Sequence, residues 1–510
     1  MKGLPCAGGL VLNTPLRQGS PKMLAPQKDA RPRRPIRAQL NQSSRTKTAT
    51  ADRKPKKKKP TLNAVRRKVK AMLDSEELLM PKLFDASSVK ALLQKVEPKE
   101  VVRRDRVYGV PITLSLFVQQ VLSKDRGCKE VITLLNKRRK AEQLSEVSTN
   151  TTSYCGARMR IPLLLIKELT QQTAQLAFAR LPADWQWRGH RVMLVDGLVV
   201  SAPDTPENQE KYPQPSSQKP GLGFPQIRLC ASICLTTGVV TDVQYGPVEG
   251  KKTGEATLFR QMFSRFTLGD IVVADSNFEC YRDMAILAAQ GVHVVCNMNG
   301  TRTSPFTGPC KMIDDETVTL PRPGFDKSRF TREEWEQLPE TMDVRIIRYK
   351  VTGRNAEVTI VTTLLDTEAY PAEAVAELYK YRWNCELDIR SIKTVLGMTW
   401  LSCHTPEMLE RELMVYFLAY NLVRVTICDA AQIADCRPRN LSFKNAKDSW
   451  LQLGQDGREI NDIAWLLWSI ADSPLHQRPR PSEPRKIKRR SSKYGKMKFP
   501  RNQEKLAFSP

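Results

Sequence analysis

The sequence predicts an α/β protein in which a mixed β-sheet is flanked by helices, interrupted by a β-rich insertion and preceded by a helical region. Two apolar runs of strand character contain or end in an aspartate, Asp196 and Asp275. A later helical run repeats polar side chains along one face. Because segments of strand and helix character alternate between these features, we expect them to form one layered α/β core.

Residues 63–184 have the apolar spacing of helices, and we expect a helical domain here. Two basic clusters, residues 103–106 and 137–140, suggest that this domain could bind DNA. A plain helical scaffold is the alternative, and no helix has the character of a recognition helix. The predicted helices include Ala64–Leu73, Ser88–Val96, Ile112–Leu122 and Cys128–Ala141.

Residues 185–297 and 370–475 are predicted to form the α/β core. An acid within an apolar strand is costly unless it is paired or binds a metal ion, which makes Asp196 and Asp275 candidate site residues. The alternative for each is a strand-end Asp that caps the next turn. The predicted strands are Arg191–Ser201, Ile227–Thr236, Val239–Gly246, Asp270–Ala274 and Val292–Asn297, with helices at Gly254–Phe266 and Tyr281–Gln290.

Residues 298–369 interrupt this core and are predicted to be a β-rich insertion. Their strand-like runs are Val344–Val351 and Glu357–Leu365. Trp335 also lies here, and tryptophan packs in a core more often than it stacks on a flipped base. After the insertion we expect a helix that opens at Pro371, then helices at Thr405–Ala431 and Asp462–Ala471.

The helical run from Glu377 to Lys393 carries a polar set with a defined spacing. Relative to Tyr379, the other members lie at offsets of 3, 7 and 14 residues; they are Arg382, Glu386 and Lys393. At about 100° per residue, the four positions fall within roughly 60° of one another on a regular helix. A carboxylate can bind a divalent cation, Arg and Lys can bind phosphate, and an aromatic ring can stack on a base. The alternative is an amphipathic helix whose charges pair and face water.

Taken together, Asp196, Asp275 and Glu386 supply three carboxylates, the ligand type that two-metal phosphoryl transfer requires. Three such acids in these contexts make the capping and surface-helix alternatives much less plausible. Nothing predicts ATP or NAD binding, because Gly221-Leu-Gly-Phe lacks the features of a P-loop and of a dinucleotide fingerprint.

The net charge of +27 is concentrated at the two ends of the chain. Residues 1–70 hold 20 Lys/Arg and two Asp/Glu, and residues 476–510 hold 12 and two, so residues 71–475 are close to neutral. We expect residues 1–62 to be a disordered basic arm and residues 476–510 a basic tail. Such arms can bind a polyanion with an affinity that falls as salt rises, although a solvated tail without a role is an equal alternative for residues 1–62.

The remaining composition favours a soluble intracellular protein. The 12 cysteines include no Cys-x2-Cys pair and only four histidines are present, so we expect reduced cysteines and no structural zinc. No apolar run is long enough for a membrane span, and the first residues lack the features of a secretory signal.

These motifs are similar to those of one family. Tyr379, Arg382, Glu386 and Lys393 match the Y-x2-R-x3-E-x6-K signature of the D,D,E transposases of bacterial insertion sequences, in the IS-four family. Asp196 in its Asp-Gly context and Asp275 in Ala-Asp-Ser-Asn-Phe resemble the first and second acids of that family. The resemblance covers roughly residues 101–475.

The resemblance implies a ribonuclease H-like catalytic core and an order of three strands, a helix and a strand, with the two aspartates side by side. It implies catalytic and metal-binding roles for Asp196, Asp275 and Glu386 with two Mg²⁺ ions, for which Mn²⁺ would substitute. It implies DNA-binding roles for Tyr379, Arg382 and Lys393. Its implied partners are double-stranded DNA, both element inverted repeats and target, and a second copy of the chain on DNA, in the bacterial cytoplasm and on the nucleoid without membrane attachment.

The sequence leaves two other readings open. One is a nonenzymatic DNA-binding protein that keeps the fold, and the other is a structure-specific nuclease that cuts without joining. The terminal repeat, the target preference, the oligomeric state and the use of a hairpin intermediate do not follow from the sequence.

Overall fold

The computed structural model describes residues 61–74, 86–96, 107–179, 181–251, 253–298, 310–327, 331–351, 357–455 and 463–475. The chain divides into two compact units, residues 1–57 and 58–510, and every described residue belongs to the second. The predicted N-terminal arm, apart from residues 61–62, and the predicted C-terminal tail lie outside the described residues.

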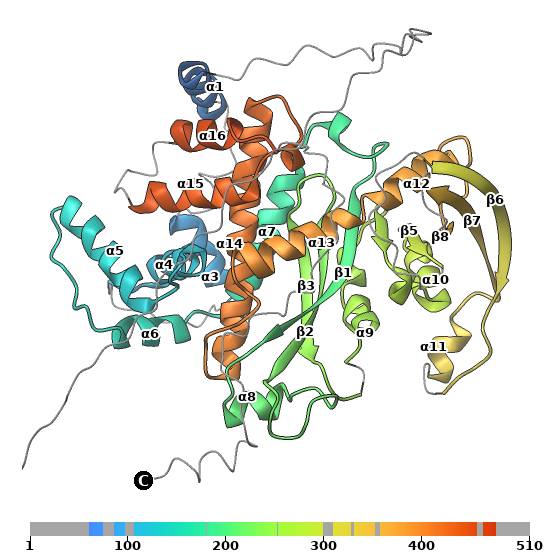
Figure 1. Ribbon diagram of the computed structural model, residues 1–510, viewed down its shortest axis with the longest axis horizontal. Helices are drawn as coiled ribbons and strands as arrows, with labels where there is room; N and C mark the ends of the chain where they lie inside the picture. Colours follow the sequence, from blue (N-terminus) through green and yellow to red (C-terminus); the bar gives the residue numbers. More distant parts are fainter. Residues whose placement is uncertain are drawn as a thin grey trace, which may run out of the picture. The chain divides into compact units, whose positions relative to one another are not determined.

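A single mixed sheet of eight strands forms the centre of the described unit, in the order β3-β2-β1-β4-β5-β8-β7-β6 (Figure 1). β1 is antiparallel to β2 and parallel to β4, and β4 is parallel to β5. This is the topology that we expect of a ribonuclease H-like sheet, and the five predicted core strands are confirmed. The strands are β1 (Val192–Ser201), β2 (Gln226–Cys234), β3 (Val240–Pro247), β4 (Ile271–Ala274), β5 (His293–Asn297), β6 (Cys310–Pro321), β7 (Thr341–Val351) and β8 (Glu357–Thr362).

Helices cover both faces of the sheet because alternate residues of the central strands are apolar on both sides. On one face, Met193 and Val195 pack in a cluster with α9 (Glu255–Arg260) and α10 (Tyr281–Ala289). On the other face, Leu194 and Leu198 join the larger cluster, which includes residues of the helices that follow the insertion. These helices are α12 (Ala372–Lys380), α13 (Trp383–Arg390), α14 (Pro406–Ile433), α15 (Phe443–Gln455) and α16 (Ile463–Ala471).

The helical region that precedes the sheet packs on the same large cluster. Its first four helices in the structure confirm the four helices predicted there, with ends that differ by two residues or fewer. Two more described helices, α6 and α7, fall in the same region that was predicted to be helical, although they were not named individually, and α7 packs along α14 and β3. The six are α1 (Leu62–Asp74), α3 (Ala86–Val96), α4 (Val110–Leu122), α5 (Cys128–Ala141), α6 (Thr152–Met159) and α7 (Leu163–Ala179).

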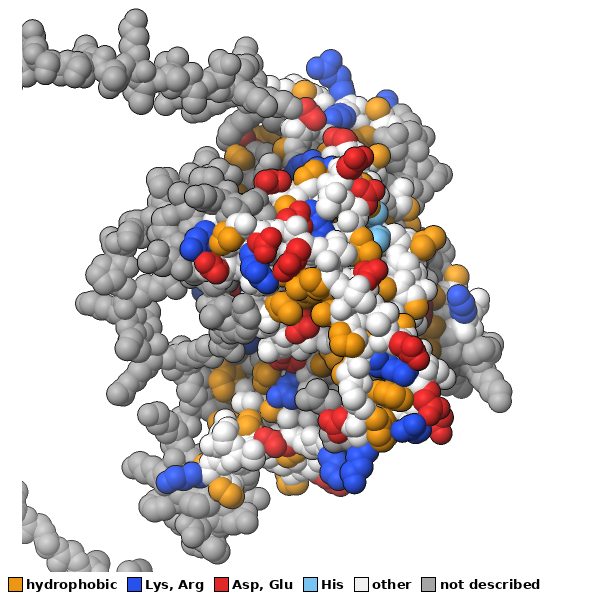
Figure 2. Space-filling model, turned by 90° about the vertical axis from the view of Figure 1, so that its right-hand side faces the viewer, with side chains coloured by type: hydrophobic (Ala, Val, Ile, Leu, Met, Phe, Trp, Pro, Cys, Tyr) orange, Lys and Arg blue, Asp and Glu red, His pale blue; other side chains and the backbone are white. Residues whose placement is uncertain are grey.

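The insertion strands continue the core sheet instead of forming a sheet of their own. β8 pairs antiparallel with β5, β7 pairs with β8, and β6 pairs along its whole length with β7. β6 was not among the predicted strands, and it contains three consecutive acids at 314–316, a residue type that is uncommon in strands. These acids are stabilised by β7, where Arg345 pairs with Asp315 at 2.6 Å and Arg348 pairs with Asp314 at 3.2 Å. Figure 2 shows basic and acidic side chains mixed on this side of the molecule.

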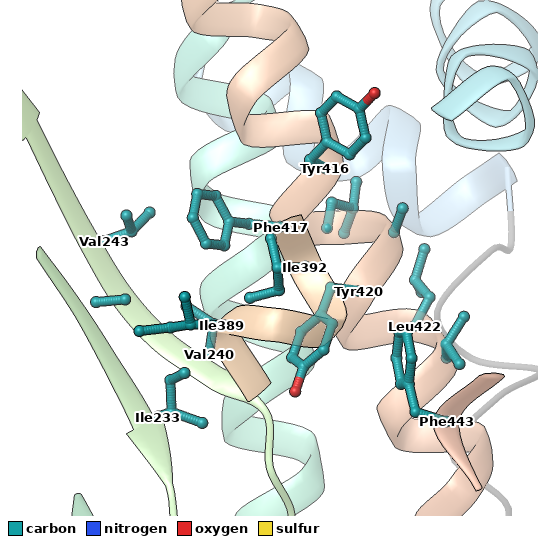
Figure 3. Close-up of a cluster of buried hydrophobic side chains, with 14 of the residues drawn as sticks. Ile233, Val240, Val243, Ile389, Ile392, Tyr416, Phe417, Tyr420, Leu422 and Phe443 are labelled. Atoms are coloured by element: carbon teal, nitrogen blue, oxygen red, sulfur yellow. The ribbon is translucent and has the colours of Figure 1, made fainter. Parts of the chain in front are cut away.

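Helix α14 is the central helix of the large apolar cluster. It has 28 residues and is long and apolar enough to cross a membrane, which corrects the expectation that no run reaches that length. Its apolar window is entirely buried within the protein, as in the core helix of a globular domain. Figure 3 shows its side chains meeting those of β2, β3 and the segment after α12; the labelled residues are Ile233, Val240, Val243, Ile389, Ile392, Tyr416, Phe417, Tyr420, Leu422 and Phe443.

A buried ion network attaches α13 to the rest of the core. Asp388 of α13 is 1% exposed, and its two carboxylate oxygens accept hydrogen bonds from Arg424 of α14 and, at 2.8 Å, from Arg439. Arg439 also donates to the backbone carbonyls of Cys234 and Leu235 at the end of β2. Since all the charges are paired, the network holds α13, α14 and β2 in one arrangement.

Replacing Asp388 by Ala should lower the free energy of unfolding by roughly 3–5 kcal/mol, because two buried guanidinium groups would lose their carboxylate. Urea unfolding followed by circular dichroism measures the change. Asp448→Ala is the matched control: that carboxylate is 52% exposed and pairs only with Lys447 at 3.2 Å among the ion pairs of the described residues, so a loss under about 0.5 kcal/mol is expected. Equal losses in the two variants would contradict the role of the network.

Candidate active site

The two predicted aspartates lie on neighbouring parallel strands. Asp196 is in the middle of β1, and Asp275 follows the last residue of β4. In the β1–β4 register Val192 pairs with Ile271 and Leu194 with Val273, so continuing that register brings Asp196 level with Asp275. The adjacency implied by the family fold is therefore present in the structure.

Each aspartate also makes a local hydrogen bond of the capping type. Asp275 Oδ1 accepts from the backbone N–H of Asn277 at 2.9 Å and begins the short 3-10 helix Ser276–Phe278. Asp196 Oδ1 accepts from the backbone N–H of Gly197 at 2.8 Å. The capping interpretation of Asp275 is thus correct as a local description, and the second oxygen of Asp275 accepts a longer hydrogen bond, at 3.5 Å, from the side-chain amide of Asn277.

The third acid, Glu386, is brought to β1 by the docking of α13. Cys385, the preceding residue, is fully buried and its thiol lies 3.8 Å from the carbonyl oxygen of Leu194 on β1. Glu386 itself is partly exposed, with 34% of its side chain accessible. α13 therefore lies directly over the strand that carries Asp196, with Glu386 at the edge of the packed surface.

Arg382 interacts electrostatically with two of the three acids, Asp196 and Glu386. Its guanidinium donates to Glu386 Oε1 at 2.9 Å and is 16% exposed. Burial opposes its charge, but the neighbouring Tyr379, Asp196 and Glu386 groups raise the pKa of Arg382 above its usual value. One cation thus lies within range of two of the three predicted metal ligands.

Asp196 is the acid whose charge is least favourable. Burial, and to a smaller extent the negative charges of Asp275 and Glu386, raise its pKa to about 7, against the opposing effects of Arg382 and the Gly197 N–H. Both other acids therefore lie within electrostatic range of Asp196. A divalent cation would relieve this crowding of like charges, so the donor chemistry fits Mg²⁺ or Mn²⁺. Among the residues that the structure describes, no three His, Cys, Asp or Glu side chains are close enough to hold one ion together.

The helix that carries the signature is not regular, which corrects the prediction of one continuous face. α12 ends at Lys380, and the backbone N–H groups of Arg382 and Cys385 bond to carbonyls three residues earlier, as in a 3-10 turn. After α13 the chain forms a π-helical turn over Ser391–Val395. The backbone is wound more tightly than an α-helix before α13 and more loosely after it, so the side chains point in directions that differ from those on a regular helix.

The three other signature residues are engaged within the protein. Tyr379 is 5% exposed, and burial raises the pKa of its hydroxyl while Arg382 opposes the shift. Lys393, in the π-helical turn, donates from Nζ to the backbone carbonyl of Val199 on β1 at 3.0 Å. In this state the Tyr379 ring is in position to support Arg382 and has no open face for a base.

Trp335 of the insertion is also held within the protein. The guanidinium carbon of Arg322 lies 3.8 Å from the centroid of its ring, and the indole N–H donates to the carbonyl of Pro323 at 2.8 Å. Phe325 contacts the same ring edge-on. These contacts fit the packing role that the residue type favours.

The residues that orient the site have no signal in the sequence. Asp388 lies two positions after Glu386 and attaches its helix to α14, but nothing in the spacing distinguishes it from a solvated helical acid. Its partner Arg439 is 51 residues away in the chain. Only the fold brings these two residues together.

The region that contains this geometry matches a known family. Residues 187–422 match the family model described as the transposase DDE domain, and all six predicted site residues lie within the match. This part of the chain is therefore similar to DDE transposase domains. Its sheet order is accordingly the ribonuclease H-like order that the resemblance implied.

The chain is also similar to a curated protein of known source. Over 295 residues the chain is 26% identical to the transposase InsG for insertion sequence element IS4 of Escherichia coli (strain K12). The aligned part covers 57% of this chain and 64% of the relative, which is less than two thirds of its length. The family resemblance given by the Y-x2-R-x3-E-x6-K signature is confirmed by this relative and by the domain match.

The raised pKa of Asp196 predicts how the stability of the metal-free protein changes with pH. The folded protein holds the proton more tightly than the unfolded chain, so this group contributes most stability below its unfolded pKa of 3.8 and loses that contribution as pH rises to about 7. Asp196→Asn removes the charge. It should therefore stabilise the protein by on the order of 2–4 kcal/mol at pH 8, and by much less near pH 5.

Thermal unfolding in EDTA at the two pH values measures this difference. Glu377→Asn is a control, because that exposed helical carboxylate does not face the site and hydrogen-bonds to Tyr381 at 3.2 Å. A gain for Asp196→Asn that is equal at pH 5 and pH 8 would contradict the assigned cause.

Proposed function

We propose that this protein is a transposase that cuts DNA at the ends of an insertion sequence and joins those ends to target DNA. The observation that carries the proposal is the grouping of Asp275, Glu386 and Arg382 around Asp196, in a region that matches the transposase DDE domain. The relative InsG is named for the same activity on element IS4. No observation favours a nonenzymatic protein or a simple nuclease.

In this proposal the three carboxylates hold two Mg²⁺ ions, or Mn²⁺ in their place, which would supply the charge that activates a nucleophile and stabilises the leaving oxygen. Asp196 and Asp275 are suited to this role because the sheet fixes both side chains on adjacent strands. Glu386 is suited because its helix is packed on β1 through Cys385 and anchored through Asp388. Water would first attack the phosphodiester at the element end and break it, which releases a 3′-OH and leaves a 5′-phosphate. That 3′-OH would then attack a phosphodiester of the target, which breaks the target strand and releases a 3′-OH of the target.

The cationic signature residues are proposed to contact the DNA backbone beside the cut. Arg382 would exchange its bond to Glu386 for a phosphate, which frees that carboxylate at the moment when DNA arrives. Lys393 would move its Nζ from the Val199 carbonyl to a phosphate in the same way. Tyr379 would brace Arg382 from beneath, and a stacking role on a displaced base requires its ring to become exposed.

The proposed partners are the two element ends, the target duplex and a second copy of the chain, because two ends must be cut in concert. The proposed location is the bacterial cytoplasm, on the nucleoid when bound to DNA. The helical region 63–184 is proposed to contribute to DNA binding through its basic clusters, of which residues 137–140 close helix α5.

Replacing Glu386 by Gln should reduce DNA cleavage by at least roughly 100-fold and leave DNA binding within a factor of about three, because the change removes a charged ligand and keeps the shape of the side chain. The substrate is a plasmid that carries the gene with its native flanking DNA, incubated with purified protein and Mg²⁺. Glu377→Gln is the matched control, an exposed glutamate on the preceding helix.

Discrete cuts at inverted repeats, made by the wild type and by Glu377→Gln but not by Glu386→Gln, would support the transposase. Joined products separate it from a nuclease that cuts without joining. Full activity of Glu386→Gln would overturn the assignment, and binding without any cleavage by the wild type would favour the nonenzymatic reading.

Removing residues 1–60 should weaken DNA binding and flatten its salt dependence, because that segment holds 16 Lys/Arg and two Asp/Glu. Each lost phosphate contact should reduce the slope of log K against log salt by about 0.9. Fluorescence anisotropy between low and moderate salt measures both slopes. An unchanged slope would show that the arm does not contact DNA.

A further inference from the structure

Two cysteine thiols of the helical region lie against each other. Cys128 is the first residue of α5 and Cys155 belongs to α6, and their sulfur atoms are 3.8 Å apart. Both cysteines are free and half-buried. The sulfur atoms are therefore in contact without a bond between them, since a disulfide bond is about 2.05 Å long.

A cavity of about 290 Å³ gives access to the two thiols. Its wall includes Cys128 and Cys155, and its other lining residues come from α4, from α6 and from the chain between residues 402 and 416. One lining residue, Met159, is 58% exposed, so the cavity reaches the surface of the helical region. Hydrogen peroxide is little larger than a water molecule and can enter a polar cavity of this volume.

A guanidinium group lies beside both thiols. Arg158 donates from Nη2 to the sulfur of Cys155 at 3.6 Å. Burial raises the pKa of the Cys128 thiol, and the positive charge of Arg158 opposes that shift. The guanidinium is held over the rings of Phe117 and Tyr154, with its carbon atom 4.9 and 5.3 Å from the two ring centroids. A fixed cation at this place favours the thiolate, which is the form of cysteine that reacts with oxidants.

We propose that Cys128 and Cys155 form a site of reversible oxidation, at which a peroxide converts the two thiols into a disulfide bond. The pair has the features of a redox-sensing site, because its thiols are accessible, adjacent to a cation and adjacent to each other. Cys128 can approach Cys155 with little rearrangement, since the backbone N–H of the first residue of a helix has no partner within that helix. The proposal concerns thiol chemistry and does not depend on the proposed function.

The reaction consumes one peroxide for each disulfide. The thiolate of one cysteine attacks a peroxide oxygen, which breaks the O–O bond, gives a sulfenic acid and releases hydroxide that is protonated to water. The thiol of the other cysteine attacks the sulfenic sulfur, which forms the S–S bond and releases a second water molecule. The two thiols together lose two electrons and two protons, and hydrogen peroxide is reduced to two water molecules. A thiol reductant restores the cysteines by thiol–disulfide exchange.

The unaltered full chain provides the first test, which does not depend on how a variant folds. The reduced protein is treated with hydrogen peroxide, denatured in N-ethylmaleimide and digested with trypsin. Cys128, Cys155 and Cys403 then lie on separate peptides, residues 127–129, 141–158 and 394–411. Mass spectrometry without reduction should find the first two peptides joined, with two hydrogen atoms lost, and dithiothreitol should separate them.

Cys280 is an internal control for this measurement. It is half-buried like the pair and lies within electrostatic range of an arginine, Arg260. The disulfide should form at least about tenfold faster than Cys280 is oxidised. Oxidation of Cys280 without a joined peptide would overturn the proposal, and so would a peptide that joins Cys403 to either member of the pair.

Variants then test the role of each group. Cys155→Ser should abolish the joined peptide, whereas Cys280→Ser should form it as the wild type does. Arg158→Gln should slow formation of the disulfide by roughly tenfold, because the thiolate loses its neighbouring cation. Arg160→Gln is the matched control, since Arg160 is exposed and donates to the carbonyl of Gly156 at 3.0 Å. Equal rates in the two arginine variants would overturn the role of Arg158.

Discussion

The ion network around Asp388 is the constraint on which the arrangement of the site depends. Its carboxylate is buried between Arg424 and Arg439, and Arg439 also binds the end of β2. One acid thereby determines where α13 lies relative to both the central helix and the sheet. Hydrophobic packing alone would allow α13 to slide or turn along β1, whereas paired buried charges tolerate little displacement. The place of Glu386 follows from this restriction.

The site itself is built from groups that do not favour one another. Asp196 carries a raised pKa because burial and two nearby acids oppose its charge, and Arg382 is the cation that offsets them. Such a set is stable only because the surrounding fold holds it. The break before α13 and the π-helical turn after it orient Arg382 and Lys393 toward β1. Both irregularities replace regular α-helical hydrogen bonds.

Much of this could be predicted from the sequence, for identifiable reasons. The strands around Asp196 and Asp275 were predicted correctly because strands buried on both faces are nearly continuous apolar runs, which are easily recognised in a sequence. β6 was missed because Asp314 and its acidic neighbours are stabilised only by Arg side chains of β7, 30 or more residues away. The residue spacing identified the signature residues, but it predicted a regular helix. The irregularities before and after α13 could not be predicted because tertiary contacts impose them. The partnership of Asp388 with Arg439 likewise has no local signal.

The continuity of the sheet has a mechanical consequence. β8 of the insertion is hydrogen-bonded to β5, and β5 to β4, whose end carries Asp275. A sheet resists shear along its ladders, so the insertion cannot swing as a hinged domain on a flexible linker. A force applied to the outermost strand, β6, would instead be transmitted through the hydrogen bonds of β7, β8 and β5 to β4. Strain at the periphery and the alignment of Asp275 with its neighbour on β1 are therefore coupled by the architecture.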